Sequence, residues 1–267
     1  MSKIGKLTQA IKILKKKPHL INQIIDHDSV YYDLVKTKYG LNNGLPVIAY
    51  TDIVKESKLS EYLFLDGGSL ITDLLLLQSL AKEIDNCNYF EIGTWRGESC
   101  STVAPFTNKC FTFNLSNDRI AQLGYDQSYL DQIELLSKNN PAIKHLKGDS
   151  LNFDFKELDI VPNLVFIDGD HHYEAVKSDS AKIFDWINPE KATIVWHDYG
   201  NSPEKPRWSV LAGILDGIPP EEHQYLYQVG NTKCAIYSRK DYLSKIQNWP
   251  QSPLIKFEIE LKIKPLI

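Results

Sequence analysis

Short apolar runs alternate with stretches of helical periodicity along most of this chain. Strands are expected at the short runs, which are 89–92, 110–115, 142–146, 163–167 and 192–196. Helices are expected where apolar residues recur every three or four positions, at 69–84, 98–106, 172–187 and 208–215, and a longer, partly helical stretch is expected over 118–138. Strands that alternate with helices in this way predict an α/β fold with a mostly parallel sheet covered by helices.

The pattern changes at both ends of this region. Residues 224–229 and 233–238 flank the turn Gly230-Asn231, which predicts a hairpin and hence an antiparallel strand in the sheet. Residues 257–263 alternate apolar and charged side chains, which predicts a strand with one wet face. We therefore expect an N-terminal helical extension and lid over 1–68, an α/β domain over 69–239, and a C-terminal helix or strand extension over 240–267.

The N-terminal extension begins with a basic amphipathic pattern. The first 17 residues carry six lysines and no acid, and their apolar positions fall on one helical face: Ile4, Leu7, Ile11 and Leu14. Such a helix can lie on an anionic membrane, and it can equally dock on its own domain or on a second subunit. A further helix is expected over 19–39.

Composition narrows the class of protein. The 267 residues are 43% hydrophobic and 24% charged, which is typical of a globular protein. The net charge of −4 disfavours a nucleic-acid binder. No run approaches the ~20 apolar residues of a membrane span, and no secretory signal is visible. Four scattered cysteines lie in apolar stretches and predict buried, reduced thiols. We expect a cytoplasmic protein.

Two predicted strands end in clusters of acids and histidines. The first cluster is Asp168-Gly-Asp-His171-His172, and the second is His197-Asp198. Carboxyl ends of parallel strands face the ligand crevice of an α/β sheet, so these side chains should meet in one small volume. Carboxylates crowded together repel one another unless a cation, a proton or a substrate is present. The clusters therefore predict a functional site.

A glycine-containing turn follows the first strand of the α/β domain. It reads Glu91-Ile-Gly93-Thr-Trp-Arg-Gly97-Glu-Ser99. The glycines allow a tight turn, and the next helix offers free N–H groups to a ligand. The spacing differs from the dinucleotide pattern G-x-G-x-x-G, and Glu91 suits a cationic ligand better than a pyrophosphate.

Together with Gly148-Asp149-Ser150 and Asp168, this turn resembles the class I S-adenosylmethionine-dependent methyltransferases. More narrowly, the chain is similar to metal-dependent small-molecule O-methyltransferases of the catechol and macrolide-sugar types. The resemblance implies a Rossmann-like seven-stranded sheet with one antiparallel strand over 69–239. It also implies S-adenosylmethionine as cofactor, bound by Glu91, Gly93, Thr94, Trp95, Gly97, Ser99, Asn114, Asp149, Ser150 and Asp168. Asn114 departs from the family, which usually has an acid there to bind the ribose hydroxyls.

The resemblance further implies a divalent metal, Mg²⁺ or Mn²⁺, on Asp168, His197 and Asp198. His197 is a second departure, because the family usually has an oxygen ligand there; an imidazole can bind the metal or orient a carboxylate. His171 is implied as the base that acts with Asp168 in catalysis, and imidazole titrates near neutral pH. The metal would lower the pKa of an acceptor hydroxyl.

These features predict an O-methyltransferase that acts on a small hydroxylated acceptor such as a sugar or a glycosylated metabolite. A metal-dependent hydrolase that uses the same Asp and His clusters is an alternative. A catalytically silent nucleoside-binding module is another, motivated by Asn114 and the lysine-rich helix. The expected partner is a small molecule, with a homo-oligomer left open.

Overall fold

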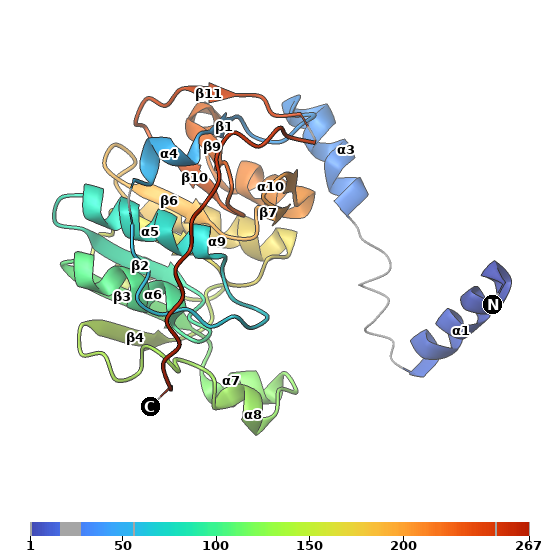
Figure 1. Ribbon diagram of the computed structural model, residues 1–267, viewed down its shortest axis with the longest axis horizontal. Helices are drawn as coiled ribbons and strands as arrows, with labels where there is room; N and C mark the ends of the chain where they lie inside the picture. Colours follow the sequence, from blue (N-terminus) through green and yellow to red (C-terminus); the bar gives the residue numbers. More distant parts are fainter. Residues whose placement is uncertain (1, 17–27, 56, 249, 267) are drawn as a thin grey trace.

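A nine-stranded sheet forms the centre of the molecule. The computed structural model describes residues 2–16, 28–55, 57–248 and 250–266. The strand order is β11-β1-β9-β10-β6-β5-β2-β3-β4, and Figure 1 shows the helices on both sides of this sheet. The bounds of these strands are β1 Val47–Ile48, β2 Asn88–Ile92, β3 Lys109–Asn114, β4 Ile143–Lys147, β5 Leu164–Ile167, β6 Thr193–Trp196, β9 Leu226–Val229, β10 Ala235–Tyr237 and β11 Ser244–Lys245.

Parallel pairing dominates the middle of the sheet. β2 pairs in parallel with β3 and β5, and β5 pairs in parallel with β6. β10 is antiparallel to both of its neighbours, β6 and β9. The α/β fold and the antiparallel strand from the terminal hairpin are thus confirmed. A separate small hairpin joins β7 (Gly200–Ser202) to β8 (Lys205–Pro206) directly after the second Asp/His cluster.

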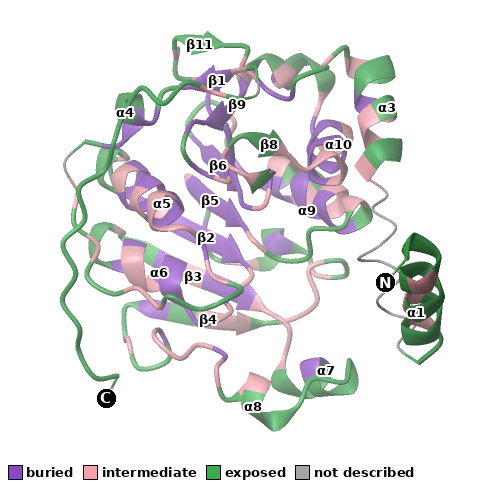
Figure 2. Cartoon of the chain, turned by 45° about the vertical axis from the view of Figure 1, so that its right-hand side comes forward, coloured by how far each residue is buried: buried purple, intermediate pink, exposed green. Residues whose placement is uncertain are grey.

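Helices pack on both faces because the buried strands are apolar on both sides. One face is covered by α3 (Asp28–Tyr39), α9 (Tyr173–Trp186) and α10 (Trp208–Gly217). The other is covered by α4 (Tyr50–Ile53), α5 (Ile71–Glu83) and α6 (Glu98–Val103). Figure 2 shows the strands between them as buried. The shorter elements are α7 Asn117–Gln122, α8 Gln127–Leu130 and 3-10 turns at Ala104–Phe106, Phe155–Glu157 and Pro220–Tyr225.

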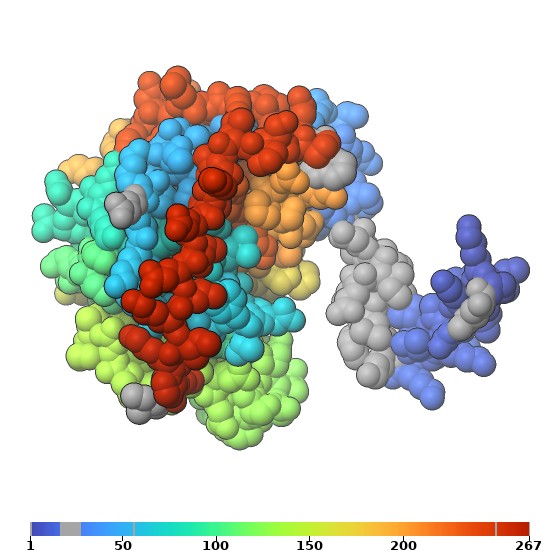
Figure 3. All heavy atoms as spheres, in the orientation of Figure 1, coloured from blue at the N-terminus to red at the C-terminus, as the bar shows by residue number. Residues whose placement is uncertain are grey.

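The strand count and the C-terminal strand need correction. The sheet has nine strands rather than seven, because β1 and β11 come from the expected extensions and add to the β9 edge. The expected strand over 257–263 is wrong: this segment is extended but pairs with no strand among the described residues. Its alternating apolar side chains are exposed, and Figure 3 shows the segment lying along the outside of the molecule. A segment with alternating apolar and charged residues forms a strand only where another strand offers an unpaired edge beside it.

The N-terminal helix is α1, Lys3–Lys16, and it buries none of its residues. It does not dock on the sheet domain (Figure 1), so a membrane or a second subunit as its partner stays a prediction. Of the helix expected over 19–39, residues 19–27 lie outside the described part, and the remainder forms α3. None of the described helices has the length and apolarity needed to cross a bilayer. All four cysteines are free and buried, as expected.

Candidate active site

The glycine turn after β2 packs tightly against the end of β5. Gly93 has φ +97°, and a Cβ there would lie 2.0 Å from the carbonyl oxygen of Asp168. The amide of Gly93 donates to the carbonyl of Phe113 at the end of β3. Glycine is therefore required at this position by the neighbouring strand ends, in addition to any ligand. The turn brings the ends of three strands together.

Glu91 and Ser99 are in contact, but they lie beneath the turn. The Glu91 carboxylate is fully buried and accepts hydrogen bonds from the hydroxyls of Tyr89 (2.6 Å) and Ser99 (2.7 Å), both at Oε2. Burial raises the pKa of Glu91 to about 7, although these hydrogen bonds oppose the rise. Oε1 is buried and has no hydrogen-bond partner within the described chain. An unpartnered buried acceptor suits a cationic group such as the ammonium of an amino acid.

Trp95 supplies a second unpartnered group in the same turn. It has φ +42°, which is strained for a bulky side chain, and strain of this kind is often found at functional sites. Its indole N–H is buried and donates to none of the described residues. The ring lies 4.4 Å from that of Tyr129, centroid to centroid. Thr94, by contrast, bonds to Thr112 through its hydroxyl and so points into the sheet.

The remaining implied cofactor residues lie along the same edge of the sheet. Gly97 directly precedes α6 with φ +80°, and a Cβ there would clash with Ser137. Asn114 ends β3 and accepts a backbone hydrogen bond from Gly148. Asp149 bonds within its own turn, to the Leu151 amide and the Asn152 side chain, and Ser150 follows it. The fold thus aligns the turns after β2, β3 and β4, and the cofactor roles of these residues stay predictions.

The two Asp/His clusters meet where the sequence predicts. His197 Nδ1 lies 2.9 Å from Asp168 Oδ1 and 3.6 Å from Asp198 Oδ2. Asp168 follows β5 and His197 follows β6, and these strands are parallel neighbours. Asp198 has φ +55°, which turns its backbone back toward the cluster. One ligand atom from each of the three residues lies within 4.8 Å of the others.

Asp73 completes this cluster, although the sequence pattern predicts only its place in the first turns of a helix. Its carboxylate is fully buried at the start of α5 and accepts from the amides of Leu70 (2.8 Å) and Lys233 (2.9 Å). His197 Nε2 lies 3.1 Å from Asp73 Oδ2. An ionised carboxylate can only accept, so Nε2 carries a proton and the position of the ring is fixed. One acid within a Leu-rich helix is the signal that could have revealed it.

Charges around the cluster set its electrostatics. Burial alone would lower the pKa of His197, but the carboxylates of Asp168, Asp198 and Asp73 outweigh burial and raise it well above the usual value. Burial raises the pKa of Asp168. Burial would also raise the pKa of Asp198, but His197 and Lys233 outweigh it and lower that pKa. The Lys233 ammonium lies 2.9 Å from Asp198 Oδ1.

His171 stands at the mouth of this cluster. Its side chain is about half exposed (51%), and its Nδ1 lies 3.9 Å from Asp198 Oδ2. Burial and then the positive charge of Arg207 lower the pKa of His171, which favours the neutral imidazole that a base requires. The adjacent His172 is more exposed and faces Asp170, which also accepts from the His172 amide at 2.9 Å. Asp170 therefore closes the turn before α9.

The donor set fits a divalent cation. Two carboxylates and an imidazole are ligands that Mn²⁺, Fe²⁺ or Zn²⁺ accept, whereas Mg²⁺ prefers oxygen alone. His197 Nδ1 is buried and has no hydrogen bond of good geometry among the described residues, although it lies near two carboxylates. Asp73 holds the opposite ring nitrogen, as carboxylates commonly do behind metal-binding histidines.

Comparisons with known proteins find similarity to methyltransferases over part of the chain. Residues 90–199 match the family model described as a methyltransferase domain. An uncharacterized protein of Acanthamoeba polyphaga mimivirus is 30% identical over 140 residues; the match covers 50% of this chain and 60% of that protein.

Two solved structures are also similar. PaMTH1 of Podospora anserina, a methyltransferase with bound SAH, is 14% identical, with 81% of this chain and 89% of that chain covered and a TM-score of 0.45. CalS10 of Micromonospora echinaspora, an amino pentose methyltransferase with bound SAM, is 14% identical, with 51% and 58% covered and a TM-score of 0.36. The family model spans the segment from β2, through the glycine turn and both Asp/His clusters, to Tyr199. This segment, 110 of the 267 residues, is therefore similar to a methyltransferase domain.

Proposed function

We propose that this protein methylates a hydroxyl oxygen of a small acceptor, such as a sugar or a glycosylated metabolite, with the help of a divalent metal. The convergence of Asp168, His197 and Asp198 beside His171 carries the proposal. Asp168 also packs on Gly93, so this cluster adjoins the turn that would hold the cofactor. The net charge of −4 favours a small molecule over a nucleic acid as acceptor. We also propose that the protein acts in the cytoplasm.

The residues of the cluster have different roles in the proposed reaction. Asp168, His197 and Asp198 would hold the metal, which when bound lowers the pKa of a coordinated hydroxyl. Asp73 and Lys233 keep His197 and Asp198 oriented through direct contacts. His171, accessible and neutral, accepts the hydroxyl proton at a ring nitrogen. Much of the acceleration would come from holding the acceptor oxygen in line with the methyl group.

Calorimetric titration with S-adenosylhomocysteine, with and without Mn²⁺, tests the cofactor. Transfer of labelled methyl groups to sugar and phenol acceptors, with and without chelator, then tests the reaction. We expect binding in both titrations and transfer that a chelator abolishes. If S-adenosylhomocysteine does not bind under either condition, the proposed function is wrong.

His171→Gln tests the base, with His172→Gln as its matched control. The first variant should lower kcat by about 10²–10⁴-fold, because it removes the proton acceptor, while the affinity for S-adenosylhomocysteine stays unchanged. The second changes the neighbouring, more exposed ring and should leave kcat within about twofold of wild type. Equal kcat values for the two variants would exclude His171 as the base.

The same assays separate the alternatives. A two-metal hydrolase needs ligands for a second ion, and the potential metal ligands in the described part of the chain form one group of three. Chelator-sensitive release of product from chromogenic esters would nevertheless favour a hydrolase. A silent nucleoside-binding module would bind S-adenosylhomocysteine and transfer no methyl group.

A further inference from the structure

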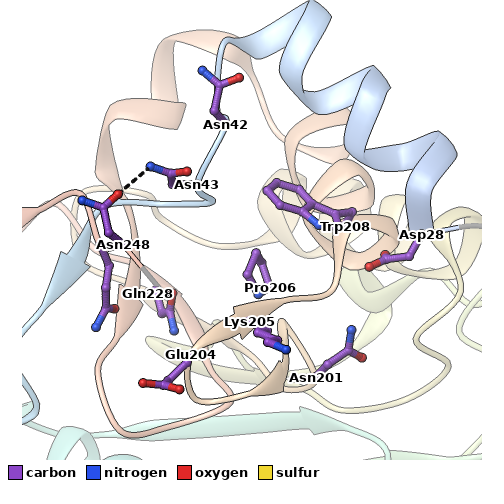
Figure 4. Close-up of a pocket in the computed structure, with 11 residues that line it drawn as sticks. Asp28, Asn42, Asn43, Asn201, Glu204, Lys205, Pro206, Trp208, Gln228 and Asn248 are labelled. Atoms are coloured by element: carbon purple, nitrogen blue, oxygen red, sulfur yellow. Dashed lines mark hydrogen bonds between the residues drawn. The ribbon is translucent and has the colours of Figure 1, made fainter. Parts of the chain in front are cut away.

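A pocket of about 350 Å³ lies near the cluster, and most of the residues that line it are polar or charged. Figure 4 shows that its walls come from separate parts of the chain: the start of α3, the loop after α3, the β7–β8 hairpin, the start of α10 and the C-terminal segment at 247–248. Its volume lies within the ~300–1,000 Å³ that is usual for small-molecule sites. Segments distant in sequence have thus been brought together around a space of ligand size.

Side-chain amides dominate the lining of this pocket. They are Asn42, Asn43, Asn201, Gln228, Gln247 and Asn248. Each amide can donate and accept at once, as can each hydroxyl of a sugar. A wall of amides is therefore complementary to a ligand that carries several hydroxyl groups.

Several of these amides have polar atoms left over for a ligand. The Asn43 side-chain nitrogen donates to Asn248 at 3.2 Å, and the Gln228 side-chain nitrogen donates to the carbonyl of Pro203 at 2.8 Å. Neither of these two bonds uses the side-chain oxygen of Asn43 or of Gln228. Gln247 Oε1 is buried and no donor in the described part of the chain reaches it. A buried acceptor without a partner costs free energy unless a ligand or water supplies a donor. Gln247 thus has an acceptor atom that a ligand in the pocket could use.

The charged and aromatic groups of the lining restrict the ligand further. Asp28 and Glu204 are acidic and Lys205 is basic, so the lining offers no excess of positive charge to an anionic ligand. Trp208 lines the pocket, and its ring packs edge-on against Tyr32 with centroids 4.8 Å apart. Its indole provides an apolar surface for the C–H groups of a sugar ring. A neutral carbohydrate fits this combination better than a phosphate or a carboxylate does.

Arg207 lies between a lining residue of the pocket and the catalytic cluster. The Arg207 Nε donates to Asn201 Oδ1 at 2.9 Å, and its Nη1 lies 3.9 Å from Asp198 Oδ2. Asn201 is three residues from Asp198, so their Cα atoms are at most ~11 Å apart. At least one wall of the pocket therefore lies close to the cluster.

We propose that this amide-lined pocket binds an uncharged glycosyl unit of the acceptor and presents a neighbouring hydroxyl to the Asp168–His197–Asp198 cluster. This inference rests on the proposed function and adds to it the residues and the charge class of the acceptor. Arg207 bonds to Asn201 in the pocket wall and lies 3.9 Å from Asp198 Oδ2, so it connects the two sites structurally.

The test uses the full chain saturated with S-adenosylhomocysteine on an array of neutral oligosaccharides and their uronic-acid and sulfated counterparts. The best neutral oligosaccharide is then titrated by calorimetry against wild type and Gln247→Met. This variant keeps the side-chain length and removes one buried hydrogen bond to the ligand, so the dissociation constant should rise about tenfold. Gln224→Met makes the same change at an exposed position outside the pocket and should leave the dissociation constant unchanged.

Retention of neutral oligosaccharides, with weakening by Gln247→Met alone, would support the inference. Preference for the anionic counterparts, no retention of any oligosaccharide, or equal affinity for the two variants would each overturn it. Titration with S-adenosylhomocysteine keeps the two proposals apart. A protein that binds S-adenosylhomocysteine but no neutral oligosaccharide refutes the pocket alone, whereas one that binds neutral oligosaccharides but no S-adenosylhomocysteine refutes the methyltransferase proposal.

Discussion

Replacing Gly93 with alanine should destabilise the protein through one close contact. The added Cβ would lie 2.0 Å from the Asp168 carbonyl oxygen, so about 1.4 Å more room is needed to reach ordinary van der Waals contact. Gly124 is a matched control, because its φ of +95° is nearly that of Gly93 (+97°) while a Cβ there would meet nothing within 4 Å. The difference between the two variants isolates the steric clash from the backbone strain.

The magnitude follows from what must move. Positive φ costs an alanine about 1–2 kcal/mol at either position. At Gly93 the strand ends must also separate, which strains the hydrogen bonds from the Gly93 amide to Phe113 (2.9 Å) and from the Asp168 amide to Ile92 (2.8 Å). Overpacking of this kind costs about 1–3 kcal/mol, and each buried bond lost adds about 1 kcal/mol. Gly93→Ala should therefore lower the free energy of unfolding by about 2–5 kcal/mol more than Gly124→Ala.

Guanidinium denaturation of the two variants, followed by circular dichroism, measures this difference. Thermal unfolding should show it as a Tm of Gly93→Ala lower by roughly 5–15 °C than that of Gly124→Ala. Equal unfolding free energies for the two variants would refute the reasoning, because the backbone strain would then account for the whole effect. Gly93→Ala should also weaken metal binding, since Asp168 moves with the strand end.

Two further predictions concern buried acids. Asp73→Asn should lower the free energy of unfolding by about 3 kcal/mol, because a buried partner of His197 loses its charge. Asp185→Asn, at an exposed acid, should lower it by less than about 1 kcal/mol in the same denaturation experiment. Equal losses for the two variants would contradict the contact between Asp73 and His197. Burial would raise the pKa of Asp216, but hydrogen bonds led by that from Lys38 lower it to about 2. Because the folded pKa is below the unfolded one, this acid stabilises the fold above about pH 4 and loses that contribution, roughly 1–2 kcal/mol, as the pH falls from about 4 to 2. Asp216→Asn should therefore differ from wild type in unfolding free energy at pH 6 and converge with it near pH 2, and a difference independent of pH would contradict this account.

Periodicity predicted the central sheet well because its strands are buried and bounded by turns. The same strand ends located Asp168, His197 and Asp198, since chain order and parallel pairing suffice to bring them together. Asp73 was missed because it reaches His197 from a helix 124 residues earlier in the chain, a contact that only the tertiary fold creates.

At the edges of the sheet, periodicity does not predict which segments form strands. β1 and β11 have two residues each, too few to carry a periodic signal, and they form because β9 offers an edge. The segment 257–263 has a strong alternating signal and no partner among the described strands. Pairing partners, rather than local pattern, decide both outcomes.

The position of β10 has a consequence for biosynthesis. Residues 235–237 insert between β6 and β9, both of which leave the ribosome earlier. Until that short stretch emerges, the growing chain carries an open apolar edge on β6 that is prone to association with other nascent chains. The central part of the sheet is thus completed by a strand made after both of its neighbours, and productive folding of this sheet must wait until residues 235–237 have been made.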